Sequence, residues 1–537
     1  MSHILFDRVT LAMPDGSVIV PEITATIAHE TVGLVGQNGC GKTTLLRAVA
    51  GDIAPSSGSI GIDGTIALMR QEAYPDGVSV AEAMGAQAQL AIHSRFESGV
   101  PKESDFDAVD WNFPAALDTA LASCGLEGLD LTREVSELSG GERNRLKLAS
   151  LLLRQPDILL LDEPTNDLDA DARGLVYSLL EGWDGPVLVA SHDRELLEQA
   201  DRIIELSPVG AFSVSGGWSA FAEAREAERE RAARALEQAR AEEAGAQRAR
   251  QASIEKQQSR NRQGRETAKR RDRSRLEINA QKERAQATSA RNRAVGSDRL
   301  EHAAQAREKA ERDVARTTPI RIELPPCHLA PSRVVLEAKG LCAKAGERTL
   351  FGPLDLKIVG PERILIRGPN GSGKSTLART LAGLDAPTIG DVEIDKARVG
   401  FLDQHLELLK PEETALQAMQ RLNPALDANA IHAALARFGF RAAWGERVVA
   451  SLSGGERVRL ALACLFSSDT APHALVLDEP TNHLDYSSIE MLEEALDGYD
   501  GAIICITHDR RFGESLRAHR TLDLGTVRKP TSNGALS

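Results

Sequence analysis

The sequence predicts an α/β protein in which two copies of one parallel-sheet domain flank a long, charged, helix-favouring segment. Three observations lead to this fold class. The same short motifs occur twice, in the same order, before and after the segment. In both copies, short apolar runs end in polar residues, as strands of a buried parallel sheet do. The segment itself, residues 222–318, contains no proline and no Phe, Trp or Tyr.

The domain organisation follows from these boundaries. At 537 residues the chain is long enough for two to four domains. We expect a first domain at 1–220, a helical linker at 221–320, a second domain at 321–530 and a short tail at 531–537 without a nucleic-acid-binding coiled coil. The linker is expected to be a hairpin whose first helix ends near residue 258 and whose polar tip spans 258–267.

Charge is unevenly distributed along the chain. The formal net charge is -14, and residues 222–318 hold 25 Lys/Arg against 17 Asp/Glu, so this segment carries +8 and the rest -22. A basic insert in an acidic body indicates one localised site for a polyanion.

The six cysteines form no C-x-x-C pair, which favours reduced thiols and no zinc. No membrane span or signal peptide is evident, and we expect a cytoplasmic protein.

Two glycine-rich loops carry the pattern G-x-x-x-x-G-K-[ST] between a strand-like run and a helical pattern. Such a loop wraps main-chain N–H groups around phosphates, the Lys reaches the β/γ-phosphates, and the Thr or Ser hydroxyl holds magnesium. A chance turn is disfavoured because the pattern recurs 332 residues later. The nucleotide-binding candidates, each loop taken with the residue that follows it, are Gly36, Gln37, Asn38, Gly39, Cys40, Gly41, Lys42, Thr43 and Thr44, then Gly368, Pro369, Asn370, Gly371, Ser372, Gly373, Lys374, Ser375 and Thr376.

A second repeated motif, Leu-Ser-Gly-Gly-Glu, opens a helical pattern in each copy. Alone it would be an ordinary helix cap, but its recurrence in register with the phosphate loops favours a second anion site. Its nucleotide-binding candidates are Ser139, Gly140, Gly141 and Glu142, and Ser453, Gly454, Gly455 and Glu456.

Paired carboxylates end a buried strand in each copy, and a histidine follows the next strand. Asp162 and Asp478 suit a magnesium shell, together with the loop hydroxyls of Thr43 and Ser375. The catalytic candidates are Glu163 and Glu479, placed to polarise an attacking water, and His192 and His508, expected to sense the γ-phosphate. The ordinary alternatives are a strand-end acid pair and structural histidines.

Together these residues resemble the nucleotide-binding domains of the ATP-binding cassette (ABC) superfamily. The resemblance implies ATP hydrolysis with ATP and Mg²⁺, with Gln71 and Gln404 touching magnesium and water. Loops containing Asp169 and Asp485 would cross between the domains. Each ATP would lie between one phosphate loop and the opposite Ser-Gly-Gly motif, so Lys42 would work with Ser453 to Glu456, and Lys374 with Ser139 to Glu142. No motif residue is lost, so both sites should hydrolyse ATP.

Two departures from the ABC pattern are evident. The family usually has an aromatic residue ahead of the phosphate loop, yet 9–16 and 339–346 contain none, which keeps GTP open as an alternative. The first copy also has about 19 more residues between Gln71 and its Ser-Gly-Gly motif, expected between 84 and 114.

Two cassettes in one chain with a charged helical linker resemble the ABC-F group of translation factors. The run 478–485 matches that group in full, whereas the first copy has Asp167 where His is common. The resemblance implies a monomer that binds near the ribosomal exit site, with the linker reaching tRNA or rRNA. Residues 248–293 hold 15 Lys/Arg and 5 Asp/Glu and no aromatics, which suits contact with RNA backbone and shape. General elongation, rescue of stalls and removal of antibiotics stay open.

Other functions remain as alternatives. The chain could be the motor subunit of an ABC transporter, although the basic linker has no role there. A DNA-repair ATPase would normally bring zinc cysteines or a far longer coiled coil. The linker itself could be a solvated spacer.

Overall fold

The structure is a computed structural model of the whole chain. It describes residues 2–69, 74–166, 168–208, 210–268, 295, 297–314, 321–345, 348–440, 442–467, 471–482 and 484–525. Two compact units are present, one formed by Met1–Ala220 with Ile320–Ser537 and the other by Phe221–Pro319. Within the described ranges, no helix is long and apolar enough to cross a membrane.

The first domain contains two sheets. The larger has the strand order β5-β6-β7-β3-β8-β9, with β9 antiparallel to β8 and the other neighbours parallel. The smaller is antiparallel, with the order β2-β1-β4. The strands are β1 (His3–Ala12), β2 (Val18–Ile27), β3 (Thr31–Gly36), β4 (Ser57–Asp63), β5 (Ile66–Met69), β6 (Ile158–Asp162), β7 (Val187–Ala190), β8 (Arg202–Ser207) and β9 (Gly210–Ser215).

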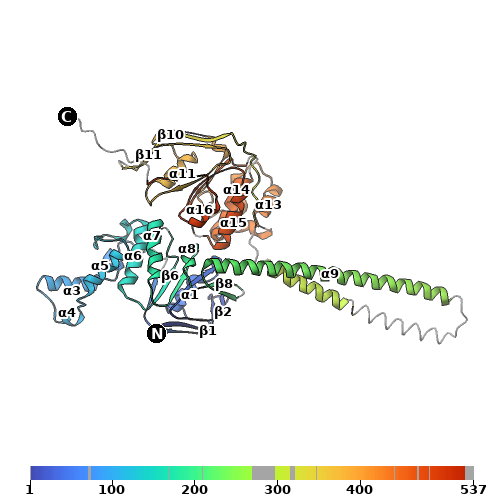
Figure 1. Cartoon of the computed structure of the whole chain (residues 1–537), viewed down its shortest axis with the longest axis horizontal. Coiled ribbons are helices and arrows are strands. Elements are labelled where there is room, and N and C mark those ends of the chain that lie inside the picture. Colours follow the sequence, from blue (N-terminus) through green and yellow to red (C-terminus); the bar gives the residue numbers. More distant parts are fainter. Residues whose placement is uncertain are drawn as a thin grey trace. The chain divides into compact units, whose positions relative to one another are not determined.

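Helices cover the larger sheet and form a lobe at one side (Figure 1). They are α1 (Lys42–Val49), α2 (Val80–Ala83), α3 (Gln87–Glu97), α4 (Glu103–Ala108), α5 (Phe113–Ser123), α6 (Gly140–Leu153), α7 (Ala170–Glu181) and α8 (Arg194–Glu198), with a 3-10 turn η1 (Val135–Glu137).

Strand β6 shows why its sequence forms a central strand. All five of its residues are buried. Successive side chains point to opposite faces of a sheet, and accordingly Ile158 and Leu160 join the core that contains α1, whereas Leu159 and Leu161 join the core that contains α6 and α7. This burial on both faces holds the strand in place, and its last residue, Asp162, lies at the carboxyl edge of the sheet.

The second domain repeats this plan. Its larger sheet is fully parallel, with the order β14-β15-β16-β12-β17, and its antiparallel sheet has the order β11-β10-β13. The strands are β10 (Val334–Ala345), β11 (Arg348–Val359), β12 (Arg363–Arg367), β13 (Ile389–Ile394), β14 (Val399–Leu402), β15 (Ala474–Asp478), β16 (Ala502–Ile506) and β17 (Arg520–Asp523). The helices are α11 (Lys374–Leu381), α12 (Ala415–Leu422), α13 (Ala428–Arg437), α14 (Gly454–Phe466), α15 (Tyr486–Asp497) and α16 (Arg510–Ser515), with 3-10 turns η2 (Lys396–Arg398), η3 (Ala442–Glu446) and η4 (Val449–Ser451).

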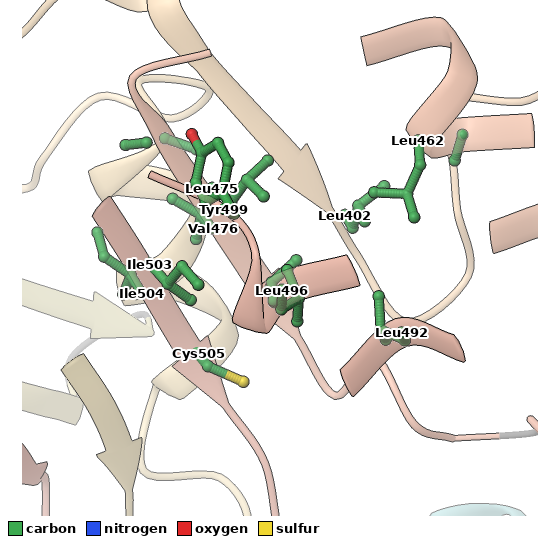
Figure 2. Close-up of a cluster of buried hydrophobic side chains, with 14 of the residues drawn as sticks. Leu402, Leu462, Leu475, Val476, Leu492, Leu496, Tyr499, Ile503, Ile504 and Cys505 are labelled. Atoms are coloured by element: carbon green, nitrogen blue, oxygen red, sulfur yellow. The ribbon is translucent and has the colours of Figure 1, made fainter. Parts of the chain in front are cut away.

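The core of the second domain lies around its central strands. Figure 2 shows Leu475 and Val476 of β15 beside Ile503 and Ile504 of β16. All four are fully buried. This packing fixes the carboxyl ends of β15 and β16, which lead directly into the carboxylate pair and the histidine.

The extra residues of the first domain form helices α3 and α4, which have no counterpart between α12 and α13 of the second domain. Figure 1 shows them projecting from the rest of the domain. The surplus expected between 84 and 114 is therefore confirmed as a helical elaboration.

Helix α9 (Trp218–Ala268) leads from the first domain into the linker unit; it has 51 residues and is about 77 Å long at about 1.5 Å per residue. The polar tip expected at 258–267 is wrong, because these residues form the last turns of α9. Gly264 costs only about 1 kcal/mol in a helix, and no proline interrupts the surrounding Arg, Gln and Glu residues.

A second helical stretch, 297–314, runs antiparallel to α9. Arg307 pairs with Glu243 at 2.8 Å, and Arg240 pairs with Glu311 at 3.4 Å. A later residue of α9 thus pairs with an earlier residue of the second stretch, as in an antiparallel hairpin. The reversal itself, and most of the basic cluster at 248–293, lie outside the described residues.

Candidate nucleotide sites

Each phosphate loop joins a central strand to a helix, β3 to α1 and β12 to α11. Gly41 and Gly373, the N-caps of these helices, have φ values of 99° and 89°, the left-handed region that favours glycine. The ammonium groups of Lys42 and Lys374 fold back and donate to the first glycine of their own loops, Nζ to O at 2.8 Å in both. Both loops thus hold a buried cation beside a helix N-terminus, an arrangement suited to phosphates.

Carboxylates lie beside the loop hydroxyls. Thr43 hydrogen-bonds Asp162, and Ser375 hydrogen-bonds Asp478, which lowers the pKa of each carboxyl, while burial is the larger effect and raises it. Oδ1 of Asp478 is buried without a hydrogen-bond partner among the described residues. An unsatisfied buried carboxylate oxygen next to a hydroxyl fits a magnesium ligand set. Gln404 lines one cavity together with Ser375 and Asp478, whereas Gln71 lies outside the described residues.

The two candidate bases have unusual environments. Glu163 and Glu479 have φ values of 48° and 49°, a strained conformation for a residue other than glycine. Burial raises the pKa of Glu163 to about 8 and that of Glu479 to about 7. Carboxyls with pKa values near neutrality suit proton transfer, and the matching strain in both copies indicates that the backbone is turned to present them.

A histidine faces each of these carboxyls. His192 Nε2 is 3.4 Å from Glu163 Oε1, and His508 Nε2 is 3.6 Å from Glu479 Oε1. Burial lowers the pKa of His192 to about 3 and that of His508 to about 4. At pH 7 both imidazoles are therefore neutral, and these contacts are polar contacts rather than ion pairs. The structure thus places the four catalytic candidates in two matched pairs, whose roles stay predictions.

Loops from each domain reach the phosphate loop of the other. The main-chain N–H of Asn38 donates to Asp485 at 3.1 Å, and that of Asn370 donates to Asp169 at 3.4 Å. The other oxygen of each Asp caps its own helix, α7 or α15. The crossing implied by the ABC resemblance is therefore confirmed, with one carboxylate bridging two domains on each side.

The first site brings some of the expected partners together. A cavity of about 410 Å³ is lined by Glu163 and His192 from the first domain and by Ser453 and Gly454 from the second. The second site is less complete. Its cavity, about 380 Å³, is lined by its own phosphate loop, carboxylates and His508, but Ser139 to Glu142 are not among the described residues that line it. That half of the pairing stays a prediction.

The Ser-Gly-Gly-Glu motifs are built as capping boxes. The hydroxyl of Ser139 accepts from the N–H of Glu142 at 3.2 Å, while the Glu142 carboxylate accepts from the N–H of Ser139 at 2.8 Å. Ser453 and Glu456 repeat this at 3.3 and 2.8 Å. Both hydroxyls already cap a helix, so the motif first defines where α6 and α14 begin.

Several lining residues were missed by the sequence analysis, among them Ile489 of the first cavity. Leu350 lines the second cavity, although it lies just after 339–346, where an aromatic residue was sought, and Ile19 packs at the corresponding place against Gly41. Arg457, one turn into α14, lines the first cavity. Arg173, in the first turn of α7, lines both cavities. Arg457 directly follows the Ser-Gly-Gly-Glu motif, which could have identified it. Arg173 could not be found from the repeat, because the second copy has no arginine at the equivalent position.

Further contacts join the domains away from the cavities. Arg194 makes three hydrogen bonds of 2.9–3.1 Å to the Glu493 carboxylate. The Tyr486 hydroxyl donates to buried Glu205 at 2.6 Å, and its ring packs edge-on against Trp218, the first residue of α9. The domains therefore meet through specific polar contacts as well as through the crossing loops.

Comparisons with known proteins agree with this geometry. A family model described as ABC transporter matches residues 23–166 and 351–482. The probable ATP-binding protein YheS of Escherichia coli K12 is 33% identical, over 92% of this chain and 74% of its own. ABC transporter F family member 2 of Arabidopsis thaliana is 30% identical, over 93% of this chain and 73% of its own.

A solved structure supports the fold alone. The archaeal ribosome recycling factor aABCE1, in complex with the ribosomal stalk protein aP1, aligns with a TM-score of 0.56 at 20% identity, covering 96% of this chain and 87% of that one. Tandem cassettes, matched sites and relatives that align along nearly the whole chain lead to one conclusion. The chain belongs to the ABC-F family of tandem ATP-binding cassette ATPases.

Proposed function

We propose that this ATPase acts on the ribosome and that its basic linker contacts tRNA or rRNA. The observation that carries the proposal is the cluster at 248–293, with 15 Lys/Arg against 5 Asp/Glu, between two ATPase domains of an otherwise acidic protein. Arg248, Arg250 and Lys256 of this cluster are exposed on α9. The fold similarity to an archaeal ribosome recycling factor is consistent with such a target.

Binding of two ATP molecules would close the domains. Lys42 and Lys374 would hold the phosphates, and the opposite Ser-Gly-Gly turns would complete each site. Because Asp169 and Asp485 each touch the other domain's phosphate loop, nucleotide at either loop alters the contact between the domains. Closure would present the linker to RNA, and hydrolysis would reverse it.

Glu163 and Glu479 would accept the proton of the attacking water at the two sites, with His192 and His508 beside them. Asp162 with Thr43, and Asp478 with Ser375 and Gln404, would hold Mg²⁺. The ion would neutralise phosphate charge when bound. Burial raises the pKa of each glutamate, which makes its carboxylate a stronger base once the carboxyl has ionised.

Sedimentation with ribosomes tests the proposal. The Glu163→Gln, Glu479→Gln double variant should bind ATP without hydrolysing it and should co-sediment with ribosomes only when ATP is present. A Lys42→Ala, Lys374→Ala variant is the matched control, because it should lose nucleotide binding and stay in the supernatant with or without ATP.

The linker is tested separately. Changing Arg248, Arg250 and Lys256 to Gln in the trapped double variant should weaken ribosome binding and reduce its dependence on salt, because fewer phosphate contacts release fewer counterions. Unchanged binding and unchanged salt dependence would contradict the proposal that this part of the linker contacts RNA. Sedimentation with membrane vesicles in place of ribosomes would instead indicate an ABC transporter motor.

A further inference from the structure

The two crossing loops share their aspartate but differ at several of the residues around it. Asp169 and Asp485 cap α7 and α15 in the same way, and each reaches the opposite phosphate loop. Four residues after each Asp, the first loop has Arg173 and the second has Ile489. One loop therefore carries a cation toward the other domain, and its twin carries an aliphatic side chain.

Arg173 is held on several sides. Its Nη1 donates to the main-chain oxygen of His508 at 3.3 Å, and its Nε donates to the main-chain oxygen of Leu168 at 3.3 Å. Its Nη1 is also 3.6 Å from the carboxylate of Asp193, and the side chain is only 13% exposed. The planar guanidinium thus connects its own loop with the histidine that follows β16 of the second domain.

This contact occurs at the second site alone. Arg173 lines the second cavity together with Lys374, Glu479 and His508. In the first cavity, the equivalent residue Ile489 lines the wall with Glu163 and His192, and its aliphatic side chain has no hydrogen-bond donor. Among the described residues, both ring nitrogens of His192 and Nε2 of His508 lack a hydrogen-bond partner, so the difference between the sites lies at the main chain. The main chain at the second histidine is therefore held across the domain boundary, and the first lacks this support.

We propose that Arg173 is a positioning residue lent by the first domain to the second ATP site, so that the two sites hydrolyse ATP at different rates, the second being faster. The guanidinium fixes the main chain that carries His508 and brings positive charge toward the cavity where phosphate charge would develop. The inference concerns ATP hydrolysis alone and holds whether or not the ribosome is the target.

Single-site variants separate the two rates. Glu163→Gln leaves the second site active, and Glu479→Gln leaves the first active. Adding Arg173→Ile, which gives the first loop the residue of the second, should lower kcat of the Glu163→Gln protein about tenfold, with KM changed less than twofold. Because Arg173 also lines the first cavity, the same change should lower kcat of the Glu479→Gln protein as well, but by less than about threefold. Equal losses in both backgrounds, or none in either, would overturn the proposal.

Two further variants exclude a merely structural effect. Arg173→Lys keeps the positive charge but not the planar guanidinium with its several donors, so it should recover only part of the second-site rate. This variant also serves as the test if Arg173→Ile does not fold. Tyr177→Phe removes a 2.8 Å hydrogen bond to Asp193 without touching His508, and it should leave the second-site rate unchanged. Should Tyr177→Phe slow the second site as much as Arg173→Ile, the effect would pass through Asp193 and the proposal would fail.

Discussion

The raised pKa of Glu163 makes a quantitative prediction about stability. In the folded protein this carboxyl keeps its proton up to about pH 8, whereas in the unfolded chain it ionises near its ordinary value of 4.5. Its contribution to stability is therefore fully present below about pH 4.5 and is lost as the pH rises through 8. Glutamine cannot ionise, so Glu163→Gln should become more stable than the parent protein as the pH rises.

The structure sets the size of this effect. One pKa unit corresponds to about 1.4 kcal/mol, so a rise from 4.5 to about 8 gives at most about 5 kcal/mol at pH 8.5 and about 1 kcal/mol at pH 5. For Glu479, whose pKa is about 7, the limit is about 3 kcal/mol. The gain in stability on substitution should therefore be larger at Glu163 than at Glu479.

Urea unfolding of the nucleotide-free protein between pH 5 and 9 measures the difference. The gain of Glu163→Gln over the parent should grow with pH and exceed that of Glu479→Gln. Glu22→Gln serves as the control, because that side chain is exposed on β2. A gain that is independent of pH, or that shrinks as the pH rises, would refute the burial of an un-ionised carboxyl at this site.

Three other predictions concern single contacts. Cys40→Ser should keep kcat within about twofold in an ATPase assay, because the second loop already has Ser372 at the same place. Arg194→Ala and Glu493→Ala should each lower the free energy of unfolding by about 3 kcal/mol, and the double variant by less than their sum, in a denaturation cycle. Gly36→Ala should abolish nucleotide binding in a filter or fluorescence assay, because its Cβ would lie 2.4 Å from a main-chain oxygen of β8.

Most of the fold and the pairing of each glutamate with a histidine could be predicted from the sequence, because the phosphate loops, the carboxylate pairs and the histidines each follow a strand made of apolar residues. Asp162 and Asp478 lie where parallel strands end, and that edge is common to all such sheets. The end of α9 could not be placed, since Gly264 is a weak signal against many good helix formers. Arg173 was missed because its partner, His508, is 335 residues away and no repeated motif marks it.

The length of α9 has a mechanical consequence. Its first residue, Trp218, rests on Tyr486 of the second domain, while 51 residues of continuous helix extend from that pivot. A tilt of about 5° at the pivot would sweep the far end of a rod of about 77 Å through roughly 7 Å. Any tilt at the start of this helix is therefore multiplied along its length.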